Sequence, residues 1–177
     1  MKKRRLKAKE YLFVDGYNII NSWESLKLKK DISLEEARDD LIEKLAEYHH
    51  YSAMEIILVF DAHFVKNNMG TEIDYKGIKV IFTKERETAD HYIEKILDKE
   101  GRIKRIRVAT SDWLEQQIIL SRGGTRISAR ELELEINNKI KIVNKNIKHR
   151  NKVNNLSLGR LDDESINKLE NWKKNTK

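Results

Sequence analysis

The sequence predicts an α/β fold, a single α/β/α domain around a mostly parallel sheet, with a basic helical extension at its C-terminal end. Short apolar runs rich in β-branched and aromatic residues alternate along the chain with longer stretches of helical periodicity. This alternation is typical of a parallel sheet covered by helices on both faces. A chain of 177 residues is long enough for one domain with a full hydrophobic core.

Four strands are expected, at residues 11–15, 55–61, 78–83 and 105–110. The first three are almost uninterrupted apolar runs, as strands buried on both faces of a parallel sheet tend to be. Proline is absent and glycine is scarce, so no flexible interdomain linker is expected.

Helices are expected between and after these strands, at residues 34–48, 89–97, 112–120, 129–147 and 161–172. Two of them begin at a capping box, in which a Ser precedes a Glu by three residues: Ser33 with Glu36, and Ser128 with Glu131. The apolar residues that follow Ser128 recur every three or four positions over about five turns, which predicts a long amphipathic helix.

The net charge of +7 is spread unevenly along the chain. Residues 1–9 carry six Lys or Arg and no acid, residues 136–161 carry seven and no acid, and the remainder is net acidic. Basic segments predict a polyanion partner, and an acidic body that meets a polyanion requires a cation to bridge the like charges. We therefore expect a basic N-terminal segment (1–9), a core domain (10–135), and a basic helix end with a C-terminal helix packed on the same domain (136–177).

Several classes of protein are excluded by composition. The chain has no cysteine, so disulfides and thiolate metal sites are impossible. No apolar run approaches the roughly 20 residues of a membrane helix, and the charged N-terminus lacks the apolar stretch of a secretory signal. We expect a cytoplasmic protein without a membrane partner.

Aspartates follow the expected strands at the edge where open α/β sheets bind ligands. Asp15, Asp61 and Asp112 stand at or just after three strand ends, and Asp90 follows the remaining strand in the first turn of a helix. A strand-ending Asp is often only a helix cap, and Asp90 could merely complement a helix dipole. Together they would repel one another unless a cation neutralised them, which favours a metal site. Oxygen-only ligands suit Mg²⁺ or Mn²⁺, and such sites typically perform phosphoryl chemistry.

Other polar residues have both a functional and a plain structural interpretation. The amide of Asn18 could hold a carboxylate or a phosphate oxygen, or serve only a turn. Arg38 stands among four acids, so a surface ion pair is expected for it. Six cations are the RNA-binding candidates, with solvated loop and helix surfaces as the alternative: Arg122, Arg126, Arg130, Lys141, Lys145 and Lys148.

Five motifs in order carry a family resemblance: VDGYN (14–18), VFDAH (59–63), FTKE followed by ETAD (82–90), ATSD (109–112) and SAREL (128–132). The chain resembles the YacP-type branch of the NYN family from residue 11 to residue 172. NYN domains are PIN-like nucleases, so the resemblance implies a PIN-like fold and metal-dependent endoribonuclease activity.

The resemblance also implies roles for individual residues. The catalytic acids of the family correspond to Asp15, Asp90 and Asp112, and Asn18 matches the polar position of the first motif. Asp61 matches an acidic strand end. Some NYN nucleases have two adjacent acids where this chain has Asp90 followed by His91. The YacP-type branch looks like ribosome-associated nucleases that cut messenger RNA.

Two further functions are considered. In a non-catalytic RNA- or ribosome-binding protein, the basic segments would bind and the aspartates would be caps. An aspartyl-phosphate enzyme is disfavoured. A dehalogenase-like phosphatase has an Asp two residues after its nucleophile, where this chain has Tyr17. A receiver domain has a Lys at the end of its last strand, and none stands beside Thr110.

Overall fold

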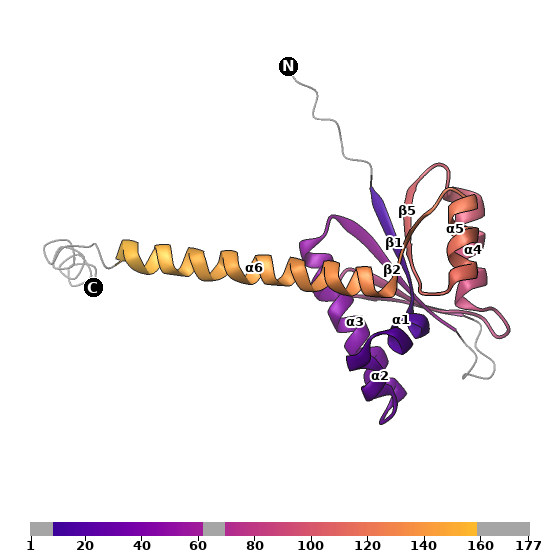
Figure 1. Ribbon diagram of the computed structural model, residues 1–177, viewed down its shortest axis with the longest axis horizontal. Coiled ribbons are helices and arrows are strands. Elements are labelled where there is room, and N and C mark those ends of the chain that lie inside the picture. Colours follow the sequence, from indigo (N-terminus) through magenta and orange to yellow (C-terminus); the bar gives the residue numbers. More distant parts are fainter. Residues whose placement is uncertain (1–8, 62–69, 159–177) are drawn as a thin grey trace, which may run out of the picture. The chain divides into compact units, whose positions relative to one another are not determined.

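The structure, a computed structural model, describes residues 9–61 and 70–158, except for the side chains of residues 113–114 and 151–158. The chain forms two compact units, residues 1–137 and 138–177. The first unit holds a six-stranded sheet with helices on both faces (Figure 1), which confirms the predicted α/β fold. Within the described ranges, no helix has the length and apolar character required to cross a membrane.

The sheet has the order β3-β4-β2-β1-β5-β6. Its strands are β1 (Glu10–Asp15), β2 (Met54–Phe60), β3 (Thr71–Tyr75), β4 (Ile78–Phe82), β5 (Arg105–Ala109) and β6 (Thr125–Ile127). β1 lies centrally and pairs in parallel with β2 and β5; β2–β4 and β5–β6 are also parallel, whereas β3 and β4 are antiparallel. The four expected strands are present within one residue of their expected bounds.

Two strands were not expected from the sequence, and both lie at edges of the sheet. Four of the five residues of β3 are exposed, so its side chains give no apolar pattern. β6 is only three residues long and has one buried residue, Ile127. Pairing with a neighbouring strand, rather than burial of its own side chains, makes each of these segments a strand.

The helices are α1 (Gly16–Ser22), α2 (Glu24–Lys30), α3 (Leu34–Tyr51), α4 (Ala89–Glu100), α5 (Trp113–Ser121) and α6 (Ala129–Leu158). Both capping boxes begin helices as expected. The Glu36 amide donates to Ser33 Oγ at 3.2 Å. At the start of α6, the Glu131 amide donates to Ser128 Oγ at 3.2 Å, and the Ser128 amide donates to the Glu131 carboxylate at 2.8 Å. The short helices α1 and α2 were not predicted as separate elements.

The helices cover the two faces of the sheet as separate layers (Figure 1). On the face of α4 and α5, the core is a cluster of buried side chains: Phe13, Ile57, Val59, Ile81, Ala89, Ile93, Leu97, Ile106, Val108 and Ile119. α1, α2, α3 and the first turns of α6 cover the other face. There the indole N–H of Trp23 donates to the Ala129 carbonyl at 2.8 Å. Glu135 accepts hydrogen bonds from Tyr48 at 2.5 Å and from Arg107 at 2.8 Å, which fixes the base of α6.

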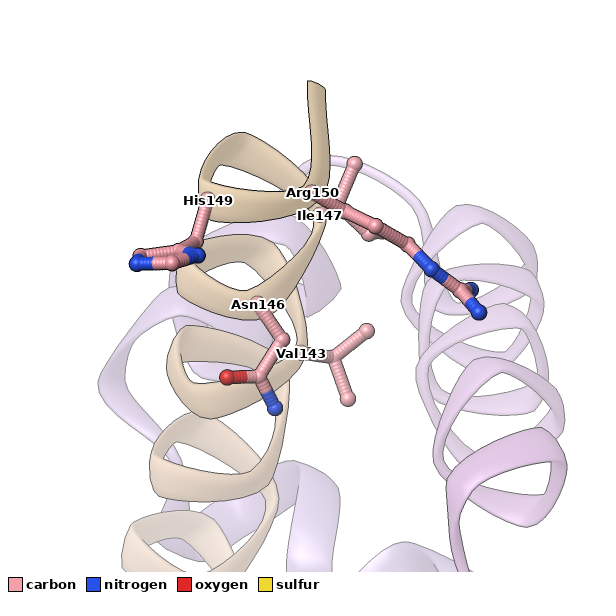
Figure 2. Close-up of a pocket in the computed structure, with 5 residues that line it drawn as sticks. All are labelled: Val143, Asn146, Ile147, His149 and Arg150. Carbon is pink, nitrogen blue, oxygen red and sulfur yellow. The ribbon is translucent and has the colours of Figure 1, made fainter. Parts of the chain in front are cut away.

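In the second unit the described residues are 138–158, all of which belong to α6. Val143, Asn146, Ile147, His149 and Arg150 of this helix line a cavity of about 420 Å³ (Figure 2). Three lysines of α6 in this unit are exposed: Lys141, Lys145 and Lys148. The basic segment 1–8 and the helix expected at residues 161–172 lie outside the described residues.

Candidate metal centre

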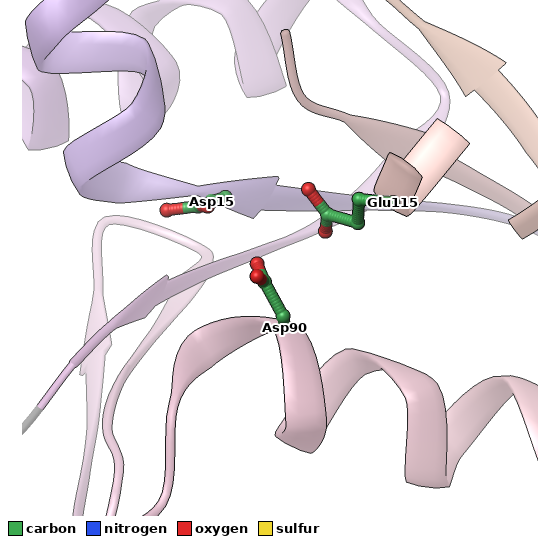
Figure 3. Close-up of side chains that lie close together, drawn as sticks. All are labelled: Asp15, Asp90 and Glu115. Carbon is green, nitrogen blue, oxygen red and sulfur yellow. The ribbon is translucent and has the colours of Figure 1, made fainter. Parts of the chain in front are cut away.

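Three carboxylates meet at the edge of the sheet where the parallel strands end. Asp15 ends β1, Asp90 lies in the first turn of α4, and Glu115 lies in the first turn of α5. One oxygen from each carboxylate lies within 4.8 Å of the other two (Figure 3). Two of these acids were expected to meet, and Glu115 is the residue that sequence analysis missed.

Asp15 is held at the end of the central strand by the start of α1. The backbone N–H of Asn18 donates to Asp15 Oδ1 at 3.1 Å, so the carboxylate also caps α1. Burial raises the pKa of Asp15 to about 7. The hydrogen bond from Asn18 lowers this pKa, and the charges of Asp90 and Asp61 raise it. Asp15 therefore caps α1 and also belongs to the acidic cluster.

Gly16 allows the chain to turn directly after Asp15. A Cβ atom at this position would lie 2.2 Å from the ring of Phe60, which is fully buried. The backbone of α1 therefore passes against this ring, and only glycine fits without displacing it. The glycine of the VDGYN motif thus sets how closely α1, and with it Asp15, packs on the sheet.

The position of Asp90 is set by a hydrogen-bonded turn between β4 and α4. The Thr83 hydroxyl donates to the Glu87 carbonyl at 2.5 Å, and the Glu87 amide donates to the Lys84 carbonyl at 3.0 Å. Thr88 then caps α4 by accepting from the His91 amide at 3.2 Å. Burial raises the pKa of Asp90, and the neighbouring charges of Asp61 and Asp112 add to this increase.

Glu115 is the most deeply buried of the three, with 4% of its surface exposed. Among the described residues, no donor forms a hydrogen bond with either of its carboxylate oxygens. Burial raises its pKa to about 8, and the charges of Asp90 and Asp15 add to this increase. Leaving a buried carboxylate without a partner is costly, and such groups are normally paired or bound to a metal.

Asp112, which was expected as the third ligand, stands one helical turn before Glu115. It is exposed, and its Oδ1 accepts a hydrogen bond from the Glu115 amide at 3.3 Å, as a helix cap does. It lies outside the trio of carboxylates within 4.8 Å, although its charge acts on Asp90.

Asp61 and Asn18 bind backbone amides around the site. The Asp61 carboxylate accepts from the Ala89 amide, which ties the end of β2 to the start of α4. Asn18 Oδ1 accepts from the Ser111 amide at 2.7 Å, which ties α1 to the loop after β5. These bonds hold together the loops that carry the trio.

Three of the expected RNA-binding cations, Arg122, Arg126 and Arg130, lie in the first unit. Arg122 forms ion pairs with Glu94 at 3.6 Å and with Asp98, and Arg126 lies 3.8 Å from Glu131. Arg130 is exposed at the start of α6. Lys141, Lys145 and Lys148 belong to the second unit.

The trio fits a hard divalent cation. All its donors are carboxylate oxygens, which Mg²⁺ and Mn²⁺ prefer, and one buried carboxylate lacks any other partner. A sequence signal for Glu115 existed, because it precedes the buried Ile119 by four residues and therefore shares its inward face. The signal is weak, since α5 is apolar on most sides.

Comparison with known proteins agrees with this architecture. A family model described as a YacP-like NYN domain matches residues 12–174. The protein YacP of Bacillus subtilis (strain 168), described as uncharacterized, is 49% identical over 128 residues, which are 72% of this chain and 75% of that protein.

Two crystal structures from Bacillus subtilis are also similar. Rae1 (YacP) is 40% identical with a TM-score of 0.68, over 93% of this chain and 95% of that one. A single-residue mutant of Rae1 is 42% identical with a TM-score of 0.70, over 81% and 84% of the two chains. This chain therefore belongs to the YacP-like NYN domain family.

Proposed function

We propose that this chain is a divalent-metal-dependent endoribonuclease that hydrolyses phosphodiester bonds within RNA. One observation carries the proposal: the buried carboxylate of Glu115 has no hydrogen-bond donor among the described residues and faces Asp15 and Asp90. Three carboxylates this close repel one another, and a bound cation removes the repulsion. The NYN family is nuclease-like and RNA-related, which supports RNA as the substrate.

In this proposal, Asp15, Asp90 and Glu115 hold Mg²⁺ or Mn²⁺. When bound, such an ion polarises a phosphate, lowers the pKa of an attacking water and stabilises the leaving oxygen. The chain's part is to hold the three carboxylates in place. Asp15 stands on the central strand, and the other two stand on the first turns of helices packed on the same sheet face.

Three further residues complete the proposed site. We assign Asp112 and Asp61 as flanking acids that would help the trio to hold the metal. Their charges act on the site: Asp61 raises the pKa of Asp15, and both raise the pKa of Asp90. Asn18 is assigned a positioning role, because its backbone N–H donates to Asp15 Oδ1 and its side-chain Oδ1 accepts from the Ser111 amide.

The finer identity of the substrate rests on the family resemblance and on charge. We propose messenger RNA on the ribosome as the target and the cytoplasm as the location. The basic segments support a polyanionic partner. The proposed RNA contacts, which read phosphates and not bases, are Arg122, Arg126, Arg130, Lys141, Lys145 and Lys148.

The first experiment tests metal-dependent cleavage. The full chain is incubated with RNA, both naked and on translating ribosomes, in Mn²⁺ or in EDTA. We expect internal cuts in Mn²⁺ and none in EDTA. Cutting that persists in excess chelator would exclude the metal mechanism. Absence of metal-dependent cutting in both settings would favour a non-catalytic binding protein.

A second experiment distinguishes a ligand from a cap at Asp15. Asparagine caps helices almost as well as aspartate, so Asp15→Asn should fold normally. It should lose most cleavage and most of the melting-temperature gain on adding Mn²⁺, because that gain reports binding to the native state. Asp74→Asn, an exposed acid on β3, is the matched control. Wild-type cleavage with a full Mn²⁺ shift in Asp15→Asn would overturn the proposal.

A further inference from the structure

Arg38 of α3 does not form the surface ion pair that its sequence neighbours predict. It stands between Glu35, Glu36, Asp39 and Asp40 in the sequence, yet it pairs with no acid within the described residues. Asp40 is instead paired with Lys29 at 3.0 Å and with Lys44 at 3.4 Å. The half-buried Arg38 keeps its charge available to another anion.

The guanidinium of Arg38 lies over the ring of Phe82, with 5.9 Å between its central carbon and the ring centroid. Phe82 is the last residue of β4, so this contact lies at the edge of the sheet where the parallel strands end. A ring face attracts a cation and orients the planar guanidinium. Arg38 is thereby held at the same edge as the carboxylates.

Ring contacts connect Arg38 to the start of α1. Phe82 stacks on Phe60 with centroids 5.5 Å apart, and Phe60 meets Tyr17 with centroids 5.1 Å apart. Tyr17 follows Asp15 by two residues. Because Phe60 also packs against Gly16, this row of rings connects Arg38 with Gly16 and Tyr17, the two residues that follow Asp15.

We infer that Arg38 binds a phosphate of the RNA strand that flanks the phosphate at the acidic trio. This inference rests on the proposed function. The trio and its flanking acids repel a polyanion, so a strand lying across this edge requires a cation close by. The proposed contacts Arg122 and Arg126 share their charge with acids of the protein, whereas Arg38 forms no ion pair among the described residues. A guanidinium binds phosphate through two parallel hydrogen bonds, and partial burial strengthens them.

The test is RNA binding, measured in EDTA so that no metal-dependent cutting intervenes. The probe is a labelled single-stranded RNA oligonucleotide, titrated with the full chain at several salt concentrations. Arg38→Ala should weaken binding about tenfold, as loss of a charged hydrogen-bonded pair does. It should also reduce the slope of log K against log salt by about 0.7, the value for one phosphate contact on a single strand.

Two variants make the result specific. Arg38→Lys keeps the charge but loses the planar fork, so it should keep the wild-type salt slope while affinity falls. Arg105→Ala removes an exposed arginine at the start of β5, at the end of the strand away from the carboxylates. It should change neither the RNA affinity nor the salt slope. Melting temperatures, measured in parallel, confirm that each variant is folded.

The outcome for Arg38 is separable from the outcome for the nuclease. Wild-type affinity and slope in Arg38→Ala would overturn the inference, even if Mn²⁺-dependent cleavage is found. The predicted loss of affinity and slope would support it. If cleavage is absent in the wild type while Arg38→Ala still loses one phosphate contact, only the proposed chemistry fails.

Discussion

Asp112, directly before α5, and Glu115, in the first turn of α5, use their carboxylates in opposite ways. Asp112 is exposed and accepts a hydrogen bond from the backbone amide of Glu115 at 3.3 Å. Glu115 turns its own carboxylate into the interior, where it meets Asp15 and Asp90 without any donor among the described residues. The helix cap and the buried acid are thus adjacent but distinct, and they predict different results when each charge is removed.

Glu115→Gln should abolish most metal-dependent activity, whereas Asp112→Asn should retain more of it. Removing a residue that only supports the metal ligands lowers metal affinity or activity about ten- to a hundredfold. We expect Glu115→Gln to lower both by more than that. Asparagine preserves the cap at position 112. The measurements are cleavage rates and Mn²⁺ affinity by calorimetry. Equal or larger losses in Asp112→Asn would assign the third ligand to Asp112.

The stability of the metal-free protein should fall as pH rises from about 5 to 8. Folding raises the pKa of Asp15 to about 7 and that of Glu115 to about 8, above their unfolded values of about 4. The native state therefore binds more protons in this range, and raising the pH removes that stabilisation. The stabilisation is complete below the pKa values that these acids have in the unfolded chain. It is lost as the pH rises through the pKa values that they have in the folded protein.

Melting temperatures in EDTA across this range would measure the effect. Glu115→Gln should flatten the dependence, while Glu35→Gln, an exposed acid on α3, should not. With Mn²⁺ present, the melting temperature should instead rise with pH, because the metal competes with protons for the same carboxylates. A wild-type profile identical to that of Glu115→Gln would contradict this account.

Gly16→Ala should destabilise the fold by about 1–3 kcal/mol, the usual cost of overpacking a core. The added Cβ would lie 2.2 Å from the Phe60 ring, which has no exposed surface. Phe60→Leu removes the obstructing ring, so the double variant should lose less than the sum of the two single losses. Urea unfolding of all four proteins completes the cycle. Strictly additive losses would show that the ring is not the obstacle.

Replacing Lys141, Lys145 and Lys148 together by Gln should weaken RNA binding and flatten its salt dependence. At roughly 0.7 per phosphate contact on a single strand, the slope should fall by about 2. These lysines are exposed on α6. The matched control replaces three exposed lysines of other helices, Lys27, Lys30 and Lys99. If both triple variants keep the wild-type slope, the lysines of α6 are only a solvated surface.

Local sequence was sufficient for the central strands and for the helix starts. β1 and β2 are apolar because they are buried on both faces, so their pattern is visible without a structure. Ser128 and Glu131 form their capping box within a single turn, and short-range chemistry alone predicts it. The aspartates at strand ends followed from the same reasoning, because parallel strands end at a shared edge.

The edge strand β6 and the third carboxylate depended on contacts between separated parts of the chain. β6 pairs with β5, and α5 lies between these two strands in the sequence. β3, in contrast, pairs with β4, which follows it directly, and its exposed side chains give no apolar pattern. The inward direction of Glu115 is set when Ile119 packs into the core beneath α5, because that packing fixes the rotation of a helix that is apolar on most sides. Arg38 likewise turns to Phe82 and not to its neighbouring acids. Helix rotation and ring packing are properties of the assembled layers, and the local sequence of α5 gives only a weak signal for the direction of Glu115.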